Sequence, residues 1–400
     1  MISSYAKNAI TLGLLAAIGP FAIDMYLPAL PTIAADLQAS TAATQMTLMA
    51  FFVAFGLCQI VYGPVSDMVG RKAPLYVGLT LFTIGSIGCG AAPSIEWLIL
   101  FRFVQGMGAS SSMVIPRAII RDLHTGVEAT RLMATVMLVL SVSPILAPLT
   151  GSALIVPFGW RAVFAAVTVV AALGFVLVAA CLRETRPAED RITVSLGSVL
   201  GGFGELLRDG RFIGLTFIGG LGMSSFFAFL ASSSFVYIGH FGLTPTEYGL
   251  AFSANAVGFI GASQFAARLG MRFGMSRVVA TAAFLFALFA VALFIVTAAG
   301  VDSLAVLIGM LFVAFACLGL VIPSTMVLAL EDHGPIAGMA SALGGTLQMV
   351  AGGVMIVIVS LVFDGTAFPM VTTIALCAVG ALALALMTLR PREILPQAAD

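Results

Sequence analysis

The feature that most constrains the fold is a series of long segments without Asp, Glu, Lys or Arg. Each has 20 residues or more, which is about the length of helix that crosses a hydrocarbon core of ~30 Å. Two further segments, 8–30 and 96–120, also qualify if each tolerates one charge inside the membrane, Asp24 and Arg102. The charge-free segments are 37–66, 73–95, 132–160, 162–182, 212–246, 248–267, 278–301, 303–330, 334–363 and 365–389.

The composition agrees with a membrane protein. With 60% hydrophobic and only 9% charged residues, a chain of 400 residues has too little polar surface for a soluble domain. The segments are apolar all round, which indicates helices rather than barrel strands. The first segment is too long for a signal peptide and runs into Asp24 and two prolines instead of a small-residue cleavage site. We therefore predict an all-α membrane protein with twelve transmembrane helices.

The basic residues predict the orientation. If the N-terminus is cytoplasmic, sixteen of the eighteen Lys and Arg residues lie on the inside, Arg161 lies outside and Arg102 lies in the membrane. We therefore expect both termini in the cytoplasm. The sixteen are Lys7, Arg71, Lys72, Arg117, Arg121, Arg131, Arg183, Arg186, Arg191, Arg208, Arg211, Arg268, Arg272, Arg277, Arg390 and Arg392.

The longest polar segment, 183–211, lies between the sixth and seventh spans and predicts a cytoplasmic linker between two six-helix halves, 1–182 and 212–400. Within it, VSLGSVLGGFGELL predicts an amphipathic helix on the inner membrane surface. A faint repeat pairs GPVSDMVGRK at 63–72 with SQFAARLGMR at 263–272, an offset that aligns Gly70 with Gly270. We expect pseudo-symmetric halves around a central cavity, the architecture that alternating-access transporters need.

The two intramembrane charges are the main candidates for chemistry. Asp24 lies ~16 residues into an outward-running helix and Arg102 ~6 residues into an inward-running one, so both are expected in the outer half of the bilayer, where they can meet. A charge at that depth costs several kcal/mol unless it is paired or hydrated. One alternative is a permanent ion pair that fixes helix packing. The other is a switchable site, because burial favours a neutral carboxyl and a nearby guanidinium favours a charged one.

Six motifs follow one another along the first half: DMYLPALP (24–31), GPVSDMVGRK (63–72), LILFRFVQGMGAS (98–110), SPILAPLTGS (143–152), GWRAVF (159–164) and ETRP (184–187). Together they resemble the major facilitator superfamily, and more narrowly its bicyclomycin/chloramphenicol-resistance (Bcr/CflA) subfamily of drug:proton antiporters. The second half is similar more loosely, at SFVYIGHFGLTP (234–245) and IAGMASALGGTLQ (336–348). The resemblance implies a major facilitator fold.

The resemblance makes GPVSDMVGRK the inner-gate loop. Gly63 and Gly70 permit a tight turn, and Asp67 can accept hydrogen bonds from the N-terminus of a helix in the other half. Arg71 can pair with Asp122 at the cytoplasmic end of the fourth span. The alternative is that these charges only anchor a cytoplasmic loop.

The prolines and glycine of SPILAPLTGS resemble the antiport motif of the fifth helix. Pro144 and Pro148 bend the helix and free backbone groups, and Gly151 permits close approach of a neighbour. Plain helix packing explains the same residues. With the resemblance, we expect a hinge or seal between the halves.

The resemblance also implicates Arg102, with Asp24, in proton coupling, and places Gln105 along the cavity one turn further on. An interhelical hydrogen bond is the alternative for Gln105. Aromatic and methionine side chains suit adaptable binding cavities, although most aromatic residues of membrane helices face lipid or core. The residues expected to contact substrate are Tyr26, Gln105, Met223, Phe226, Phe227, Tyr237, Asn255 and Gln348.

The sequence thus predicts a proton-coupled exporter, at the bacterial inner membrane, of small amphipathic drug-like compounds such as phenicols, bicyclomycin or sulfonamides. The alternative is a proton-coupled importer of a small metabolite on the same fold. No catalytic nucleophile set, cofactor motif or metal-spaced cluster is found in the sequence, so we expect no enzyme activity, no cofactor and no metal. The expected partners are substrate, protons and the lipid bilayer, with no nucleic acid, and we expect a monomer.

Overall fold

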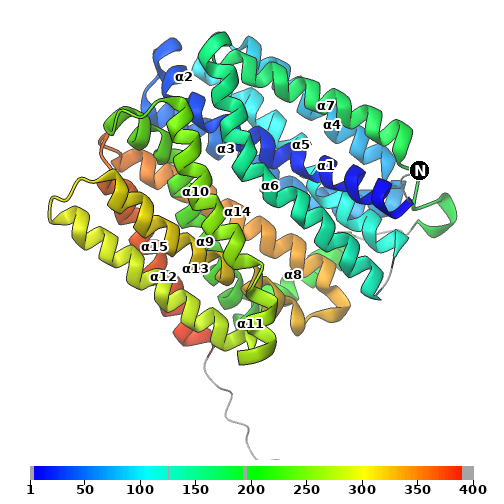
Figure 1. The fold of residues 1–400 in the computed structure, drawn as a ribbon. Helices are drawn as coiled ribbons and strands as arrows, with labels where there is room; N and C mark the ends of the chain where they lie inside the picture. Colours follow the sequence, from blue (N-terminus) through cyan, green and yellow to red (C-terminus); the bar gives the residue numbers. More distant parts are fainter. Residues whose placement is uncertain (1–3, 125, 192–195, 390–400) are drawn as a thin grey trace, which may run out of the picture.

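The computed structural model describes residues 4–124, 126–191 and 196–389. Within these residues, twelve segments are long and apolar enough to span a membrane. Figure 1 shows two groups of helices side by side, the early part of the chain in blue to teal and the later part in green to red. The predicted all-α class and the count of twelve spans are confirmed. The boundaries at 183 and 211 stay a prediction.

The first six spans use seven α-helices, because the first span is interrupted. Its pieces, α1 and α2, are joined by the short 3₁₀ helix η1. The elements are α1 (Ser4–Asp24), η1 (Leu27–Ala29), α2 (Leu30–Asp36), α3 (Thr41–Val69), α4 (Lys72–Ala91), α5 (Ile95–Leu123), α6 (Gly126–Phe158) and α7 (Arg161–Cys181).

The linker contains the helix that VSLGSVLGGFGELL predicted, although Val194 and Ser195 lie outside the described residues. The seventh span ends in a π-helix, η3, and the eighth bends between α10 and α11. The elements are η2 (Ala188–Asp190), α8 (Leu196–Arg208), α9 (Gly210–Ser234), η3 (Phe235–His240), α10 (Pro245–Ser263), α11 (Ala266–Phe273), α12 (Met275–Ala298), α13 (Leu304–Glu331), η4 (Gly334–Ile336), α14 (Ala337–Val362) and α15 (Phe368–Thr388).

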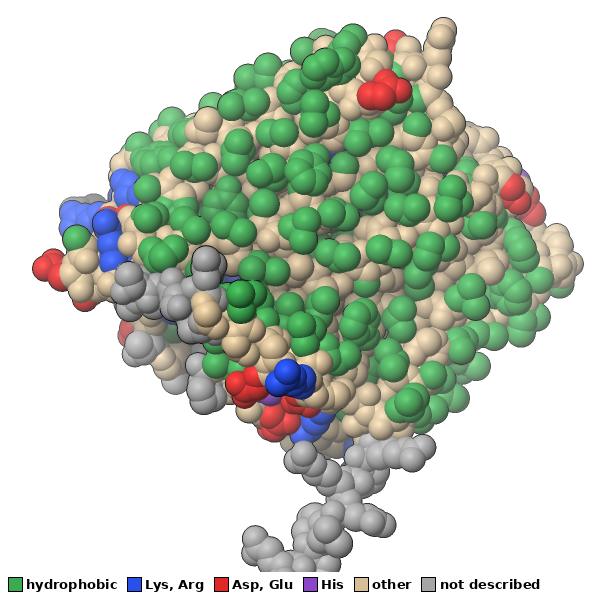
Figure 2. All heavy atoms as spheres, turned by 180° about the vertical axis from the view of Figure 1, so that it is seen from behind, with side chains coloured by type: hydrophobic (Ala, Val, Ile, Leu, Met, Phe, Trp, Pro, Cys, Tyr) green, Lys and Arg blue, Asp and Glu red, His purple; other side chains and the backbone are tan. Residues whose placement is uncertain are grey.

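The outer surface of the bundle is apolar. Figure 2 shows hydrophobic side chains across the middle of the drawn face, with Lys and Arg only along its left and lower edges. Large apolar side chains such as Val156, Leu361 and Leu376 are 68%, 78% and 70% exposed. Apolar surface this extensive is stable against lipid rather than water. Two of the basic residues used to predict the orientation, Arg390 and Arg392, lie outside the described residues.

The first span breaks directly after Asp24, where a single helix through 8–30 was expected. Pro28 has no N–H and therefore cannot donate to the carbonyl group of Asp24, four residues earlier. The chain tightens into 3₁₀ turns instead, with the N–H of Tyr26 donating to Ile23 O (3.1 Å) and that of Ala29 to Tyr26 O (2.9 Å). The proline thus places the aspartate at a helix end.

The halves meet along two pairs of helices, α6 with α10 and α3 with α14. Hydroxyl groups donate to backbone carbonyls across both seams, Ser253 Oγ to Ile145 O at 2.9 Å and Thr346 Oγ1 to Gly56 O at 2.7 Å. Figure 1 shows α6 and α10 side by side where the two groups of helices touch. The junction is therefore packed and hydrogen-bonded in this state.

The pseudo-symmetry is real, but the predicted alignment of the repeat was wrong. Gly70, with φ of 98°, separates α3 from α4, and Gly274, with φ of 86°, separates α11 from α12. Both adopt the left-handed region that glycine accepts at little cost. Gly270, which the sequence paired with Gly70, lies inside α11. The equivalent position is therefore four residues later than the repeat suggested.

Candidate functional site

Asp24 is a buried carboxyl group without a partner. It is the last residue of α1 and is 6% exposed. Among the described residues, no side chain or backbone group forms a hydrogen bond or ion pair with it. A helix C-terminus carries partial negative charge, so this position and the burial both disfavour an ionised carboxylate. The closed state therefore favours the neutral, protonated form.

Three elements converge on the break that follows Asp24. The carbonyl group of Met25 packs so tightly against Gly151 of α6 that a Cβ atom there would collide with it. From the other half, Tyr248 of α10 lies close enough to Asp24 for their charges to interact. The Tyr248 hydroxyl forms a 3.0 Å hydrogen bond with Ser233. The carboxyl group thus lies at the junction of the halves.

Arg102 is fully buried between two aromatic rings. Its guanidinium carbon lies 4.5 Å from the ring centre of Tyr26 and 4.5 Å from that of Phe51. Its Nη1 donates to Gln105 Oε1 at 2.6 Å, and Gln105 Nε2 donates to Ser86 Oγ at 2.8 Å. The Nε and Nη2 atoms have no hydrogen-bond partner among the described residues. Cation–π contacts therefore replace much of the hydration that this charge has lost.

The expected meeting of Asp24 and Arg102 is not found, because no ion pair joins them. The helix break turns the chain so that Tyr26, two residues after Asp24, covers the guanidinium. The Tyr26 hydroxyl lies 2.8 Å from Thr47 Oγ1, which fixes the ring. The two charges are thus linked through a short stretch of backbone. A permanent ion pair, the structural alternative for these residues, is excluded in this state.

Two of the predicted substrate residues, Phe226 and Phe227, point in different directions from α9. Phe227 stacks on Phe52 of the other half, with ring centres 3.9 Å apart. Phe226 instead packs against Phe259 and Phe315, with ring centres 5.8 Å away in each case. Phe227 therefore lies at the junction, and Phe226 lies inside the second half.

The polar candidates of the second half are also buried. Asn255 Nδ2 donates weakly to the Tyr237 hydroxyl at 3.5 Å, and its Oδ1 has no partner among the described residues. Gln348 Nε2 donates to Thr216 O at 3.4 Å. Met223 lies half-buried on α9. These contacts leave one unused acceptor, on Asn255.

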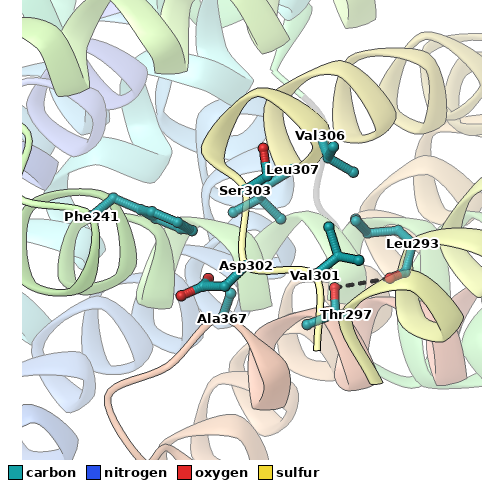
Figure 3. Close-up of a pocket in the computed structure, with 9 residues that line it drawn as sticks. All are labelled: Phe241, Leu293, Thr297, Val301, Asp302, Ser303, Val306, Leu307 and Ala367. Carbon is teal, nitrogen blue, oxygen red and sulfur yellow. Dashed lines mark hydrogen bonds between the residues drawn. The ribbon is translucent and has the colours of Figure 1, made fainter. Parts of the chain in front are cut away.

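Neither of two cavities found in the bundle is lined by a predicted substrate residue. Figure 3 shows the smaller one, near the α12–α13 connection, with Asp302 at its edge and Thr297 bonded to the carbonyl group of Leu293. At about 10 Å³ it has room for roughly one water molecule. The larger, of about 400 Å³, lies between α11, α12 and α13. The predicted substrate residues lie instead in the packed junction and its surroundings.

The predicted gate loop forms a compact ion cluster. Arg71 is 3% exposed, and its Nε and Nη2 atoms donate to Asp122 at 2.7 and 3.0 Å. Its Nη1 lies 2.7 Å from Asp67. Burial lowers the pKa of Arg71, but the hydrogen bonds and charges of these carboxylates outweigh it and hold the pKa above its ordinary value. The expected Arg71–Asp122 contact is present.

The start of the linker closes over this cluster. Glu184 accepts from the backbone N–H of Arg71 at 2.8 Å and of Lys72 at 3.1 Å, and Thr185 donates to Asp122 at 2.9 Å. Burial raises the pKa of Glu184, but its bonds to backbone N–H groups outweigh this and hold the pKa below its ordinary value. All partners found for the cluster lie at or before Arg186. The expected contact of Asp67 with the other half is therefore absent in this state.

Comparison with known proteins agrees with this architecture. The family model described as Major Facilitator Superfamily matches residues 12–356. The chain is 36% identical to the uncharacterized MFS-type transporter YdgK of Bacillus subtilis, over 90% of each chain. It is 30% identical to the bicyclomycin resistance protein homolog of Haemophilus influenzae, over 92% of this chain and 93% of that one. It is 29% identical to multidrug resistance protein D of Escherichia coli, over 86% and 85%.

Solved structures show the same fold with different cargoes. The human organic anion transporter MFSD10 (TETRAN) superposes with a TM-score of 0.69 at 19% identity, over 96% of this chain and 98% of that one. A D-xylose-proton symporter superposes with a TM-score of 0.71 at 17% identity, over 95% and 96%. The fold alone therefore does not name a substrate. The family model covers most of the sequence and relatives at 30% identity or more cover nine-tenths of it, so the chain belongs to the major facilitator superfamily.

Proposed function

We propose that the protein exports small amphipathic drug-like compounds in exchange for protons, as a member of the Bcr/CflA subfamily. Two of the relatives, at 30% and 29% identity, are named for bicyclomycin and multidrug resistance. The observation that carries the proposal is the unpaired, buried Asp24 at a helix break between the halves. Such a group is neutral in a dry site and charged in a wet one, which is what proton coupling requires.

In the proposed cycle, Asp24 binds its proton from the outside and loses it to the inside. The closed junction holds the neutral acid, and opening to the cytoplasm hydrates it and releases the proton. Substrate then competes with the proton for the same carboxyl group. Arg102 acts through Tyr26, whose ring it contacts. The unused guanidinium donors of Arg102 provide hydrogen bonds for a polar group of the substrate.

The substrates that fit this junction are neutral or singly positive. Asp24 is the only carboxyl group deep within the spans, so a dication would remain half unpaired. Phe227, Tyr237 and Phe52 provide aromatic surface on both sides of the junction. Phenicols, bicyclomycin and sulfonamides have this combination of an apolar body and a few polar groups. A sugar or organic-acid importer would be expected to hold more fixed polar groups here.

We assign the Asp67, Arg71 and Asp122 cluster to the inner gate, with Gly63 and Gly70 permitting its turn. In this structure the cluster has partners only in the first half and the linker, whereas η1 and α2 contact α9 and η3 at the opposite end. This pattern fits a state closed to the outside, in which the inner gate is released. Pro144, Pro148 and Gly151 then act as the hinge and seal beside Asp24. The proposed location is the bacterial inner membrane with cytoplasmic termini.

The test is drug accumulation in cells that express the protein. Wild type is expected to lower the accumulation of at least one compound from a panel of phenicols, bicyclomycin, sulfonamides and lipophilic cations, and a protonophore is expected to restore it. Asp24→Asn serves as the inactive control at matched expression. Accumulation that increases with expression, and falls with the protonophore, would identify an importer instead. Robust efflux of a dication would contradict the proposed charge selection.

A further inference from the structure

The second half contains a groove that the proposed transport cycle does not use. It lies between α11, α12 and α13 and has a volume of about 400 Å³, within the range of small-molecule sites. It opens on the bundle surface, since the lining residues Phe273 and Thr281 are exposed. Its walls are mostly apolar and include Leu269, Phe273, Val278, Leu285, Cys317 and Leu320.

Two arginines mark one end of this groove. Arg277, in the first turn of α12, lines the groove and is exposed. Arg272 is exposed in the last turn of α11, and its guanidinium carbon lies 5.1 Å from the ring centre of Phe273. Within the part of the chain that the structure describes, no acidic side chain forms an ion pair with either arginine. Uncompensated positive charge therefore adjoins an apolar groove.

The equivalent loop of the first half shows what is missing here. Asp67 lies three residues before the left-handed Gly70 and pairs with Arg71. Three residues before the left-handed Gly274 stands Met271, which is 82% exposed. The position that neutralises an arginine in one half thus presents an exposed apolar side chain in the other. Basic residues beside exposed apolar ones are typical of a surface that contacts the membrane interface.

We propose that this groove binds an anionic phospholipid of the cytoplasmic leaflet. The lipid phosphate lies on Arg277 and Arg272, and one acyl chain lies against the apolar walls. Basic pockets between transmembrane helices on the cytoplasmic side suit such headgroups. A soluble anion would match the arginines but leave the apolar walls without a partner, whereas a phospholipid satisfies both. The choice of leaflet follows from the proposed orientation.

The test is lipid retention by the purified full-length protein, measured by native mass spectrometry. Phosphatidylglycerol and phosphatidylcholine with identical acyl chains are the two probes. We expect preferential retention of phosphatidylglycerol, and a loss of about five-fold with Arg277→Gln or with Arg272→Gln, since each arginine near anionic lipid contributes ~1 kcal/mol. Arg131→Gln, which removes an exposed arginine on α6 of the first half, is the matched control and is expected to change nothing.

A second variant separates the groove from surface charge. Thr281→Phe adds bulk to an exposed lining position without changing charge, and Leu320→Phe does the same from the α13 side. Either is expected to lower phosphatidylglycerol retention while both arginines remain. Gel filtration identifies which variants are folded. Unchanged retention in both folded variants, equal retention of the two lipids, or an equal loss with Arg131→Gln would each overturn the proposal.

Discussion

The connection between α3 and α4 turns on Gly70 with φ of 98°, and the connection between α11 and α12 turns on Gly274 with φ of 86°. In the first, Arg71 is 3% exposed and held by two carboxylates. In the second, Arg272 is exposed and has no acidic partner among the described residues. The halves thus share a backbone turn but differ in what their side chains can do. We infer that ionisable contacts act as a gate in the first half and face lipid in the second.

The same asymmetry holds inside the membrane. Asp24 and Arg102, the deeply buried charges, belong to the first half. Across the junction, the second half presents Tyr248, Tyr237 and Asn255, which are neutral. A carrier needs only one half to change its charge, provided that the other supplies a surface whose fit depends on that change. We infer this division of roles for the two halves.

The largest expected effect compares Arg71→Ala with Arg272→Ala. Removing Arg71 leaves Asp122, whose side chain is 12% exposed, without its main partner, and breaking a buried pair costs ~3–5 kcal/mol of unfolding free energy. Arg272→Ala removes an exposed, unpaired charge and is expected to change it by less than ~0.5 kcal/mol. Thermal unfolding midpoints in detergent measure both. Equal shifts would remove the proposed difference between the two loops.

A smaller effect compares Gly151→Ala with Gly309→Ala. The new methyl group at residue 151 would collide with the carbonyl group of Met25, and since backbone cannot yield as a side chain does, we expect ~1–3 kcal/mol of destabilisation and reduced efflux. Residue 309 on α13 has open space, so alanine there is expected to be neutral or stabilising. Efflux at matched expression is the readout. Wild-type efflux by Gly151→Ala would disprove the tight seal beside Asp24.

The smallest effect is one in which the halves should behave alike. Burial raises the pKa of Glu184 and of Asp209, but bonds from backbone N–H groups outweigh it and hold each pKa below its ordinary value. Each therefore adds stability above the ordinary carboxyl pKa of about 4, and this is lost as pH falls through the lower folded value. Both groups are partly exposed, so solvent screening keeps the effect small.

We expect the unfolding midpoint of wild type to fall between about pH 6 and pH 3, and Glu184→Gln or Asp209→Asn to flatten this dependence by similar small amounts. Unfolding followed across this pH range tests the sign. A midpoint that rises on acidification, or profiles that neither substitution changes, would contradict the assignment of these two caps.

The sequence predicted the number of spans because membrane length leaves charge-free segments that can be counted. It did not predict where the first span breaks, although Pro28 was the available signal. The repeat was misaligned because the spacing between the halves is not constant. Gly70 corresponds to Gly274, 204 residues later. The tight contact of Gly106 with the carbonyl group of Phe51 resembles that of Gly319 with Phe259, whose positions are 213 and 208 residues later.

The sequence identified the residues of the site better than their contacts. Depth along each helix placed Asp24 and Arg102 at similar levels, but helix rotation decided that Tyr26 and Phe51 cover the arginine. Tyr248 was not singled out, because nothing local to PTEYG tells which half its hydroxyl group faces. Periodicity along one helix cannot supply contacts that depend on how several helices cross.

The central claim is that Asp24 is the group that exchanges a proton for substrate. The most direct measurement is proton release from the purified protein in detergent, followed against pH, on adding a compound that the accumulation panel identifies as cargo. Wild type is expected to release about one proton per substrate bound, and Asp24→Asn to release none while remaining folded. Asp36→Asn, which changes an exposed carboxylate at the end of α2, is expected to behave as wild type. Proton release and uphill export that persist in Asp24→Asn would show that coupling lies elsewhere.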